Sequence, residues 1–108
     1  MDNFLQTIGA INDETRVKIL NFINIHGEVC VCDIENSFSM IQSRVSRHLK
    51  ILKDAGFLKV DRKGRWAYYS IRAPLDIFRE SILRVSIFLG LSSFKITVPE
   101  LVDTGLLD

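Results

Sequence analysis

The two cysteines of the chain, Cys30 and Cys32, stand one residue apart in a run that also holds Glu28, Asp33 and Glu35. Thiolates bind soft metal and metalloid ions in preference to hard ones. Cysteines this close in sequence rarely reach disulfide geometry, so we expect free thiols in a reducing cytosol and hence a cytoplasmic protein. Closed structural zinc needs four protein ligands. The pair therefore predicts a soft-ion site with two protein thiolates.

A basic block follows the cysteines. Residues 42–72 hold nine Lys or Arg against two Asp, a charge of +7, which leaves −6 for the remainder of a chain whose net charge is +1. A basic block beside an acidic remainder suits a surface that meets a polyanion on one side. An ordinary solvated face is the alternative. The donors that could reach base edges or phosphates are Gln42, Ser43, Arg44, Ser46, Arg47, Lys50, Arg62, Lys63 and Arg65.

The first six of these donors fall in a predicted helix. Ile41, Val45, Leu49 and Leu52 recur at spacings of four, four and three, which predicts a helix that ends near Ala55. The donors occupy its other side, as in a helix that enters the major groove of double-stranded DNA. His48 falls on the inner side of this helix. We expect it to be half-buried against a backbone group, with base contact or metal ligation as the alternative.

The remaining three donors surround a predicted turn. Two β-prone runs, 57–62 and 65–71, flank Lys63-Gly64 and predict a hairpin with a basic tip. A basic hairpin after a recognition helix indicates a winged helix-turn-helix, a mainly α fold with a small β-hairpin. For Trp66, Tyr68 and Tyr69 we expect packing of the hairpin on the helices, with stacking on bases as the alternative.

Other helices must frame these elements. Asn12 or Asp13 can cap a helix that Gly27 ends, and a short helix is expected over 31–37. Pro74 fits the first turn of a last helix over 75–91. That helix is apolar on most of its circumference, which predicts a homodimer formed through the terminal helices. Its most apolar part is too short for a membrane span.

Length and composition set the domain organisation. A chain of 108 residues, 47% hydrophobic and 25% charged, is expected to form a single domain over 1–108. Within it we expect a DNA-binding core over 12–73, a dimerisation helix over 74–91 and a C-terminal tail over 92–108.

The string from Val45 to Leu58 resembles the recognition-helix signature of the ArsR/SmtB family of winged-helix repressors, and the match continues through 61–66 and Tyr69. The stretch 27–34 is similar to the box of the arsenic- and antimony-responsive members. The resemblance implies a dimeric repressor that releases its operator DNA when trivalent arsenic or antimony binds Cys30 and Cys32. It implies no required cofactor.

The chain departs from this pattern in three places. Glu35 stands where relatives often carry a third cysteine, so water, hydroxide or a small thiol would complete a trivalent arsenic site, whereas a monosubstituted organoarsenical needs only two thiols. Ile41 replaces a common capping serine, so Ser39 is expected to cap the recognition helix instead. The last helix has Asp76 and Glu80 but no histidine, so zinc or cadmium sensing there is not expected.

The cysteine spacing predicts how binding could act on DNA. Residues two apart in a regular helix point about 200° apart, so an ion held by both sulfurs should distort the first turn of the short helix. We expect that distortion to reorient Ser43, Arg44 and Arg47.

Other functions remain open from the residues. The same cysteines could serve a redox-responsive regulator, although the acidic neighbours count against reactive thiolates. A thiol oxidoreductase would need a Cys-x-x-Cys motif, which is absent, so no enzyme is expected. A winged-helix interaction module that never meets nucleic acid is disfavoured by the basic block.

Overall fold

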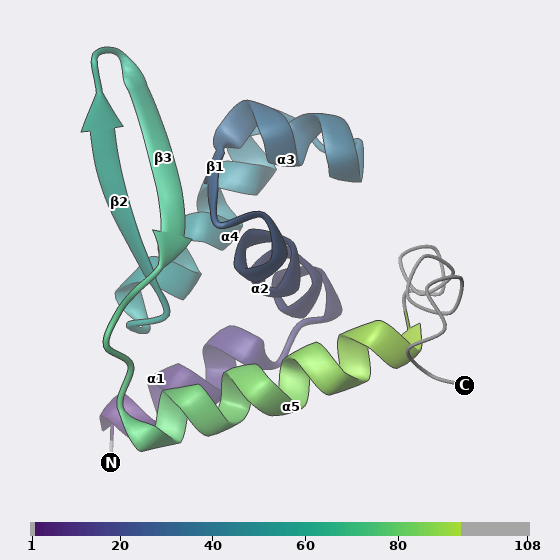
Figure 1. Ribbon diagram of the computed structural model, residues 1–108, viewed down its shortest axis with the longest axis vertical. Helices are drawn as coiled ribbons and strands as arrows, with labels where there is room; N and C mark the ends of the chain where they lie inside the picture. Colours follow the sequence, from purple (N-terminus) through teal and green to yellow (C-terminus); the bar gives the residue numbers. More distant parts are fainter. Residues whose placement is uncertain (1, 94–108) are drawn as a thin grey trace.

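The computed structural model describes residues 2–93, which form five helices and one three-stranded sheet (Figure 1). The elements are α1 (Asp2–Ile11), α2 (Glu14–His26), β1 (Glu28–Cys30), α3 (Val31–Phe38), α4 (Gln42–Asp54), β2 (Leu58–Lys63), β3 (Trp66–Ile71) and α5 (Ile77–Ser93). The order is that of a winged helix-turn-helix, as predicted. Almost all of the predicted tail, from residue 94 onward, lies outside the described residues.

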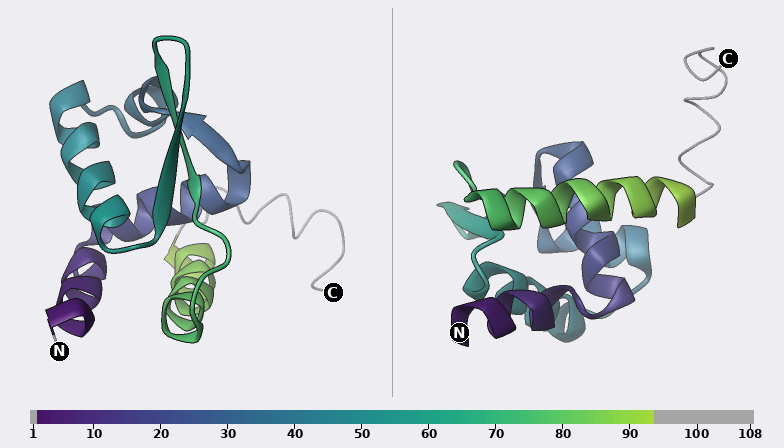
Figure 2. Two further views of the ribbon diagram at one scale, coloured as in Figure 1. Left: turned by 90° about the vertical axis from the view of Figure 1, so that its left-hand side faces the viewer. Right: turned by 90° about the horizontal axis from the view of Figure 1, so that it is seen from below.

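The two terminal helices lie at one end of the molecule and the hairpin projects from the other (Figures 1 and 2). The rings of Phe4 in α1 and Phe78 in α5 stack with centroids 5.2 Å apart. Arg79 of α5 donates to Asn3 Oδ1 and Thr7 Oγ1 of α1 at 2.8 and 3.0 Å. These contacts hold α1 against α5. No helix of the described part is long and apolar enough to cross a membrane.

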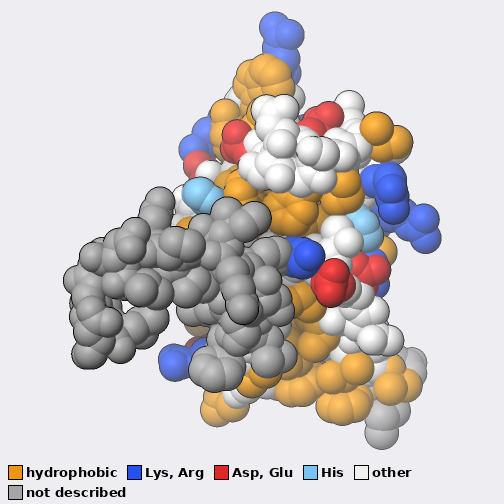
Figure 3. Space-filling view, turned by 90° about the vertical axis from the view of Figure 1, so that its right-hand side faces the viewer, with side chains coloured by type: hydrophobic (Ala, Val, Ile, Leu, Met, Phe, Trp, Pro, Cys, Tyr) orange, Lys and Arg blue, Asp and Glu red, His pale blue; other side chains and the backbone are white. Residues whose placement is uncertain are grey.

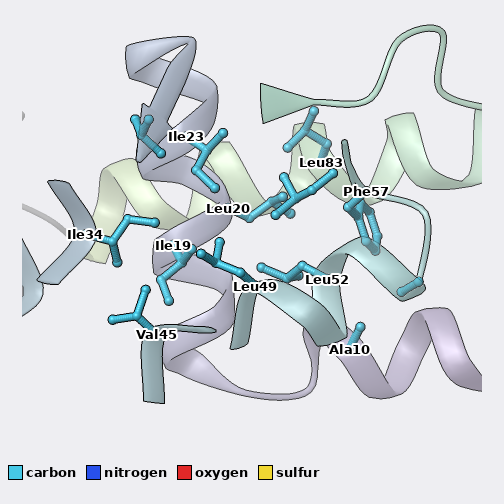
Figure 4. Packing of buried hydrophobic residues seen from close by; sticks show 13 residues of the cluster. Ala10, Ile19, Leu20, Ile23, Ile34, Val45, Leu49, Leu52, Phe57 and Leu83 are labelled. Carbon is cyan, nitrogen blue, oxygen red and sulfur yellow. The ribbon is translucent and has the colours of Figure 1, made fainter. Parts of the chain in front are cut away.

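The core lies where α2, α3, α4 and α5 converge on the base of the hairpin (Figure 4). The predicted stripe of α4 is confirmed at Val45, Leu49 and Leu52, all of which are fully buried. Ile41 is 65% exposed, so its place in that stripe was wrong. It precedes α4 in extended backbone and is therefore off the helical wheel. The core side chains are Ala10, Ile19, Leu20, Ile23, Val29, Ile34, Val45, Leu49, Leu52, Ala55, Phe57, Leu58 and Leu83.

The sheet has three antiparallel strands in the order β1-β3-β2. The predicted hairpin β2–β3 is confirmed, with Lys63 opposite Trp66 at its tip. Strand β1 was not predicted, because three residues are too few to show a period of two. It pairs Glu28 with Ser70 and Cys30 with Tyr68, so the first cysteine belongs to the sheet.

Some of the predicted helix caps are present and others are not. Asp13 caps α2 by accepting the N–H of Arg16 at 3.0 Å, and Gly27 ends α2 at φ 89°, as predicted. Ser39 does not cap α4. It ends α3 in the left-handed region at φ 53°. Pro74 precedes α5, which starts at Ile77, because the Asp76 carboxylate accepts the N–H of Arg79 at 2.8 Å and so starts the helix later.

Candidate functional site

The cysteine pair sits at the junction between a strand and a helix. Cys30 ends β1 and is the N-cap of α3, with extended backbone at φ −92° and ψ 168°, and Cys32 lies in the first turn of α3. Their sulfurs are joined in a disulfide, with the Cα atoms 5.3 Å apart. The prediction of free thiols is therefore wrong for this structure. The separation is within the usual range of about 4.4–6.8 Å, because the chain changes direction between the two residues.

The same junction corrects the expected distortion of α3. The 100° step of a helix would separate the two sulfurs only if both cysteines were helical, but Cys30 lies outside the helix. The two sulfurs already meet on one side of the chain without any unwinding of α3. An ion shared by both sulfurs therefore needs no melted helix.

The sulfur of Cys30 also helps to start α3. Cys30 Sγ accepts the backbone N–H of Asp33 at 3.3 Å, and Asp33 Oδ2 accepts the backbone N–H of Cys30 at 3.0 Å. This reciprocal arrangement is a capping box, usually built from a Ser or Thr and a Glu or Gln. The sulfur that could bind an ion is therefore also the acceptor that caps α3.

Asp33 is the third member of the group. A carboxylate oxygen of Asp33 and the sulfurs of Cys30 and Cys32 all lie within 4.8 Å of one another. Cys30 is 7% exposed, whereas Cys32 and Asp33 are exposed. Glu35 is not in this cluster. Asp33 was not among the predicted site residues, although its place three residues after an N-cap is the spacing of a capping box.

The predicted DNA-binding residues of α4 share one exposed surface. Gln42, Ser43, Arg44, Ser46, Arg47 and Lys50 are all exposed, while Val45 and Leu49 between them are buried. Lys50 Nζ lies 2.8 Å from Asp54 Oδ2, and that hydrogen bond raises the pKa of Lys50. Arg44 and Arg47 form no ion pair with any residue that the structure describes, which leaves both guanidinium groups available to a polyanion.

The predicted wing residues are Arg62, Lys63 and Arg65, all exposed at the tip of the hairpin. Lys63 Nζ lies 2.8 Å from Glu28 Oε1 and 5.1 Å from the centre of the Tyr68 ring. The hydrogen bond that Lys63 donates to Glu28 raises the pKa of Lys63. The wing tip is thus tied to β1, two residues before Cys30.

The hairpin aromatics divide into two groups. Trp66 is 53% exposed, so the expectation that it packs on the helices is wrong. Its register position opposite Lys63 puts it at the tip, beyond the reach of the core. Tyr68 and Tyr69 are half-buried, and Tyr69 packs against the core as predicted.

His48 is half-buried, as predicted, but its partner is a side chain rather than a backbone group. His48 Nδ1 lies 3.3 Å from Arg16 Nη1. Burial lowers the pKa of His48, and the charges of Arg16, Arg44 and Arg47 lower it further, against an opposing effect from Asp13. These five residues line a cavity of about 220 Å³. Arg16 was missed because nothing in its spacing connects it with residue 48.

Two connections link the cysteine pair to the DNA-facing surface. Through α3, Ile34 joins the core cluster that contains Val45 and Leu49 of α4. Through the sheet, Cys30 pairs with Tyr68 of β3, and Glu28 binds Lys63 at the wing. The cysteine pair is therefore connected to α4 through α3 and to the wing hairpin through β1, and these two elements carry the exposed cations.

Comparison with known proteins gives a consistent result. The family model described as bacterial regulatory protein, arsR family, matches residues 13–60. The cadmium resistance transcriptional regulatory protein CadC homolog of Staphylococcus aureus is 40% identical over 62 residues, which are 57% of this chain and 51% of that protein. The arsenical resistance operon repressor of Escherichia coli is 30% identical over 79 residues, 73% of this chain and 68% of that one.

A solved structure is similar in fold. The homodimeric winged helix-turn-helix DNA-binding domain of a possible ArsR-family regulator from Mycobacterium bovis superposes with a TM-score of 0.67 at 24% identity. The superposition covers 85% of this chain and 79% of that one. The match to the cadmium-resistance relative spans only about half of that relative's length.

Proposed function

Because the chain belongs to the arsR family of bacterial regulatory proteins, we propose that it is a homodimeric, cytoplasmic transcriptional repressor that releases operator DNA when trivalent arsenic or antimony binds Cys30 and Cys32. The observation that carries the proposal is the meeting of the two sulfurs at the start of α3. The name of the Escherichia coli relative, an arsenical resistance operon repressor, supports the choice of effector.

The donor set favours a thiophilic ion over zinc. Cys30 and Cys32 supply two soft ligands once they are reduced, whereas the Asp33 carboxylate is hard and already accepts the N–H of Cys30. In the described part of the chain no other Cys or His lies in this cluster, so a tetrahedral zinc site lacks ligands. The third position of a trivalent ion falls to water, hydroxide or a small thiol.

The exposed cations are the proposed DNA contacts. Gln42, Ser43, Arg44, Ser46, Arg47 and Lys50 would face the major groove, and Arg62, Lys63 and Arg65 would lie along the backbone or the minor groove. The supporting facts are their common exposure and the absence of ion pairs at Arg44 and Arg47 within residues 2–93.

A second copy of the chain is the proposed partner for α1 and α5. Hydrophobic side chains gather at the end of the molecule where these helices lie (Figure 3). Exposed apolar residues there are Phe4, Leu5, Ile8, Ile77 and Val85, of which Ile77 is 85% exposed. Apolar groups on neighbouring helices favour burial against a like surface, and a two-fold dimer would present two copies of α4 to a palindromic operator. The homodimeric domain from Mycobacterium bovis supports this arrangement.

The proposed response starts at the cap of α3. When a trivalent ion replaces the sulfur–sulfur bond at Cys30 Sγ, the position of this acceptor relative to the N–H of Asp33 changes, and the first turn of α3 is perturbed. Because α3 packs on α4 through the core, Ser43, Arg44 and Arg47 shift relative to the groove. Couplings of this kind typically amount to about 1–3 kcal/mol, or about 5–150-fold in operator affinity.

The test is operator binding by the reduced protein, measured by fluorescence anisotropy during titration with arsenite, antimonite, a monosubstituted trivalent organoarsenical or zinc. We expect release by the trivalent arsenic and antimony compounds and none by zinc. Arsenite bound at one per subunit with unchanged operator affinity would refute the proposal. The oligomeric state is checked by sedimentation, where a monomer at micromolar concentration would refute the dimer.

A redox-responsive regulator is the second candidate function, and the Cys30–Cys32 disulfide is the observation that favours it. In that case two thiols lose two electrons and two protons to a two-electron oxidant such as peroxide, and the sulfurs join. Cys32 is exposed and thus open to such an oxidant. Peroxide that releases the operator at stoichiometric amounts, with reversal by dithiothreitol and no response to arsenite, would select this function over the first.

A further inference from the structure

A cationic cavity lies between the start of α2 and the inner edge of α4. It is lined by Asp13, Arg16, Arg44, Arg47 and His48 and measures about 220 Å³. Three guanidinium groups face one carboxylate across it, so the lining carries a charge of +2 even with His48 neutral. A space of this charge and size suits a compact oxyanion.

Arg16 is fixed in place before any ligand arrives. Its Nε donates to the carbonyl of Ala10 at 2.6 Å, and its Nη2 donates to the carbonyl of Gly9 at 3.3 Å. Nη1 lies 3.7 Å from Asp13 Oδ2, and the side chain is only 14% exposed. The last turn of α1 therefore holds the guanidinium, so little side-chain entropy remains to be lost on binding.

The single carboxylate of the cavity is already engaged. Asp13 Oδ1 accepts the N–H of Arg16 as the cap of α2, and Oδ2 faces Arg16 Nη1. Burial alone would raise the pKa of Asp13, but the N–H of Arg16 and the charges of Arg16 and His48 lower it overall. By contrast, Arg44 and Arg47 have no ion-pair partner within the part of the chain that the structure describes. The cavity thus has unmatched positive charge.

We propose that this cavity holds one phosphate group of the DNA backbone, with Arg16 and His48 as the inner contacts and Arg44 and Arg47 as the outer ones. Arg44 and Arg47 belong at once to this cavity and to the exposed face of α4, so a phosphate that borders the groove would lie beside them. The start of α2 adds its helix dipole on the same side. The inference rests on the proposed binding of DNA and adds one contact outside the helix-turn-helix pair α3 and α4, namely Arg16 of α2.

The recognised chemistry is a phosphate oxyanion, which a duplex or free inorganic phosphate could supply. The chain has only two histidines, His26 and His48, so NMR can follow both imidazoles in the full-length protein. The charged groups that face His48 are Asp13 at the N-cap of α2, Arg16 of α2, and Arg44 and Arg47 of α4, and Arg16 in turn donates to the carbonyls of Gly9 and Ala10 in α1. A phosphate placed among them should raise the pKa of His48 and leave that of His26, at the far end of α2, unchanged.

The experiment titrates both imidazoles in the free protein, with saturating operator duplex, and with inorganic phosphate. A rise for His48 alone with duplex is the expected result. Bound duplex without any change at His48 overturns the cavity contact but leaves DNA binding intact. If no duplex binds, the proposed function fails instead. The titration with inorganic phosphate then tests the cavity on its own. A rise in the pKa of His48 supports binding of phosphate from solution, and no rise overturns the proposal.

Salt dependence gives a second, independent measurement. Arg16→Gln should reduce the magnitude of the slope of log affinity against log salt by about 1, as for one lost phosphate contact. The matched control is Lys53→Gln, which removes one exposed cation from α4 outside the cavity and should leave that slope unchanged. Equal slopes for wild type and a folded Arg16→Gln would overturn the contact. If Arg16→Gln does not fold, the His48 titration of the wild type carries the test.

Discussion

The starts of the two helices in the helix-turn-helix pair are built in opposite ways. Helix α3 begins with a closed capping box in which Cys30 Sγ and Asp33 Oδ2 each accept a backbone N–H. Helix α4 begins at Gln42, and its N-cap residue is Ile41, whose side chain offers no acceptor and is 65% exposed. The first helix is thus capped by a sulfur. In the second, the N–H of Arg44 donates to the carbonyl of Ile41 at 3.1 Å, and the N–H groups of Gln42 and Ser43 are left to solvent or to a phosphate.

The largest expected effect separates the two roles of Cys30. In reducing buffer, Cys30→Ser keeps an N-cap oxygen but removes the thiol, and Cys30→Ala removes both. We expect both variants to bind operator and to lose the whole response to arsenite. Only Cys30→Ala should also lower the free energy of unfolding, by about 1 kcal/mol. Fluorescence anisotropy of the operator measures the first effect and urea unfolding the second. An arsenite response retained in Cys30→Ser would contradict the role of Cys30 as an effector ligand.

A second prediction separates base recognition by α4 from phosphate binding by the wing. Gln42→Ala in α4 should cost about 1–3 kcal/mol against the preferred operator and relax discrimination between bases, because Gln42 is exposed and lies outside the cationic cavity. Arg62→Gln in the wing should weaken all duplexes alike and reduce the salt slope by about 1. Binding to operator and to an unrelated duplex at several salt concentrations tests both. Equal loss of discrimination in the two variants would contradict the division.

The helix starts themselves give a third pair of variants. Asp33→Ala opens the capping box of α3 and should lower the free energy of unfolding by about 1 kcal/mol. Ile41→Ser supplies an acceptor at the uncapped start of α4 and should raise it by up to about 1 kcal/mol, since the apolar side chain it removes is exposed. Urea unfolding reports both. An unchanged free energy of unfolding in both variants would contradict the proposed difference between the two helix starts.

The smallest expected effect is a pH dependence from His48. The pKa of this residue is lowered in the folded protein by burial, and by the charges of Arg16, Arg44 and Arg47, from an ordinary value of 6.5. The unfolded chain therefore binds more protons just below pH 6.5, and stability falls as the pH drops through this range. His48→Gln should flatten that part of the curve, and His26→Gln should not. Urea unfolding between pH 5 and 8 measures it, and parallel curves for wild type and His48→Gln would exclude the effect.

The sequence predicted most of the fold because the helices and hairpin have clear periodicity. Val45, Leu49 and Leu52 identified the buried side of α4, and Lys63-Gly64 identified the turn. Strand β1 could not be found, because it exists only through pairing with β3, forty residues away in the chain. That omission placed Cys30 in the wrong local geometry.

The candidate site was predicted by residue type but not by arrangement. A helical wheel assigns directions only to residues inside the helix, so it misjudged Cys30 and Ile41, which both precede one. The contacts of Asp33 are local and could have been predicted from the N-cap spacing. The contact of Arg16 with His48 depends on how α1, α2 and α4 pack, which no local pattern encodes.

The central claim is that the thiol that caps α3 also receives the effector and thereby controls DNA binding. Linkage requires the coupling to be reciprocal, so operator must weaken arsenite binding by the factor by which arsenite weakens operator binding. The direct measurement is the arsenite affinity of the reduced protein with and without saturating operator duplex. We predict an affinity about 5–150-fold weaker in the presence of operator. Equal affinities in the two conditions would contradict the claim.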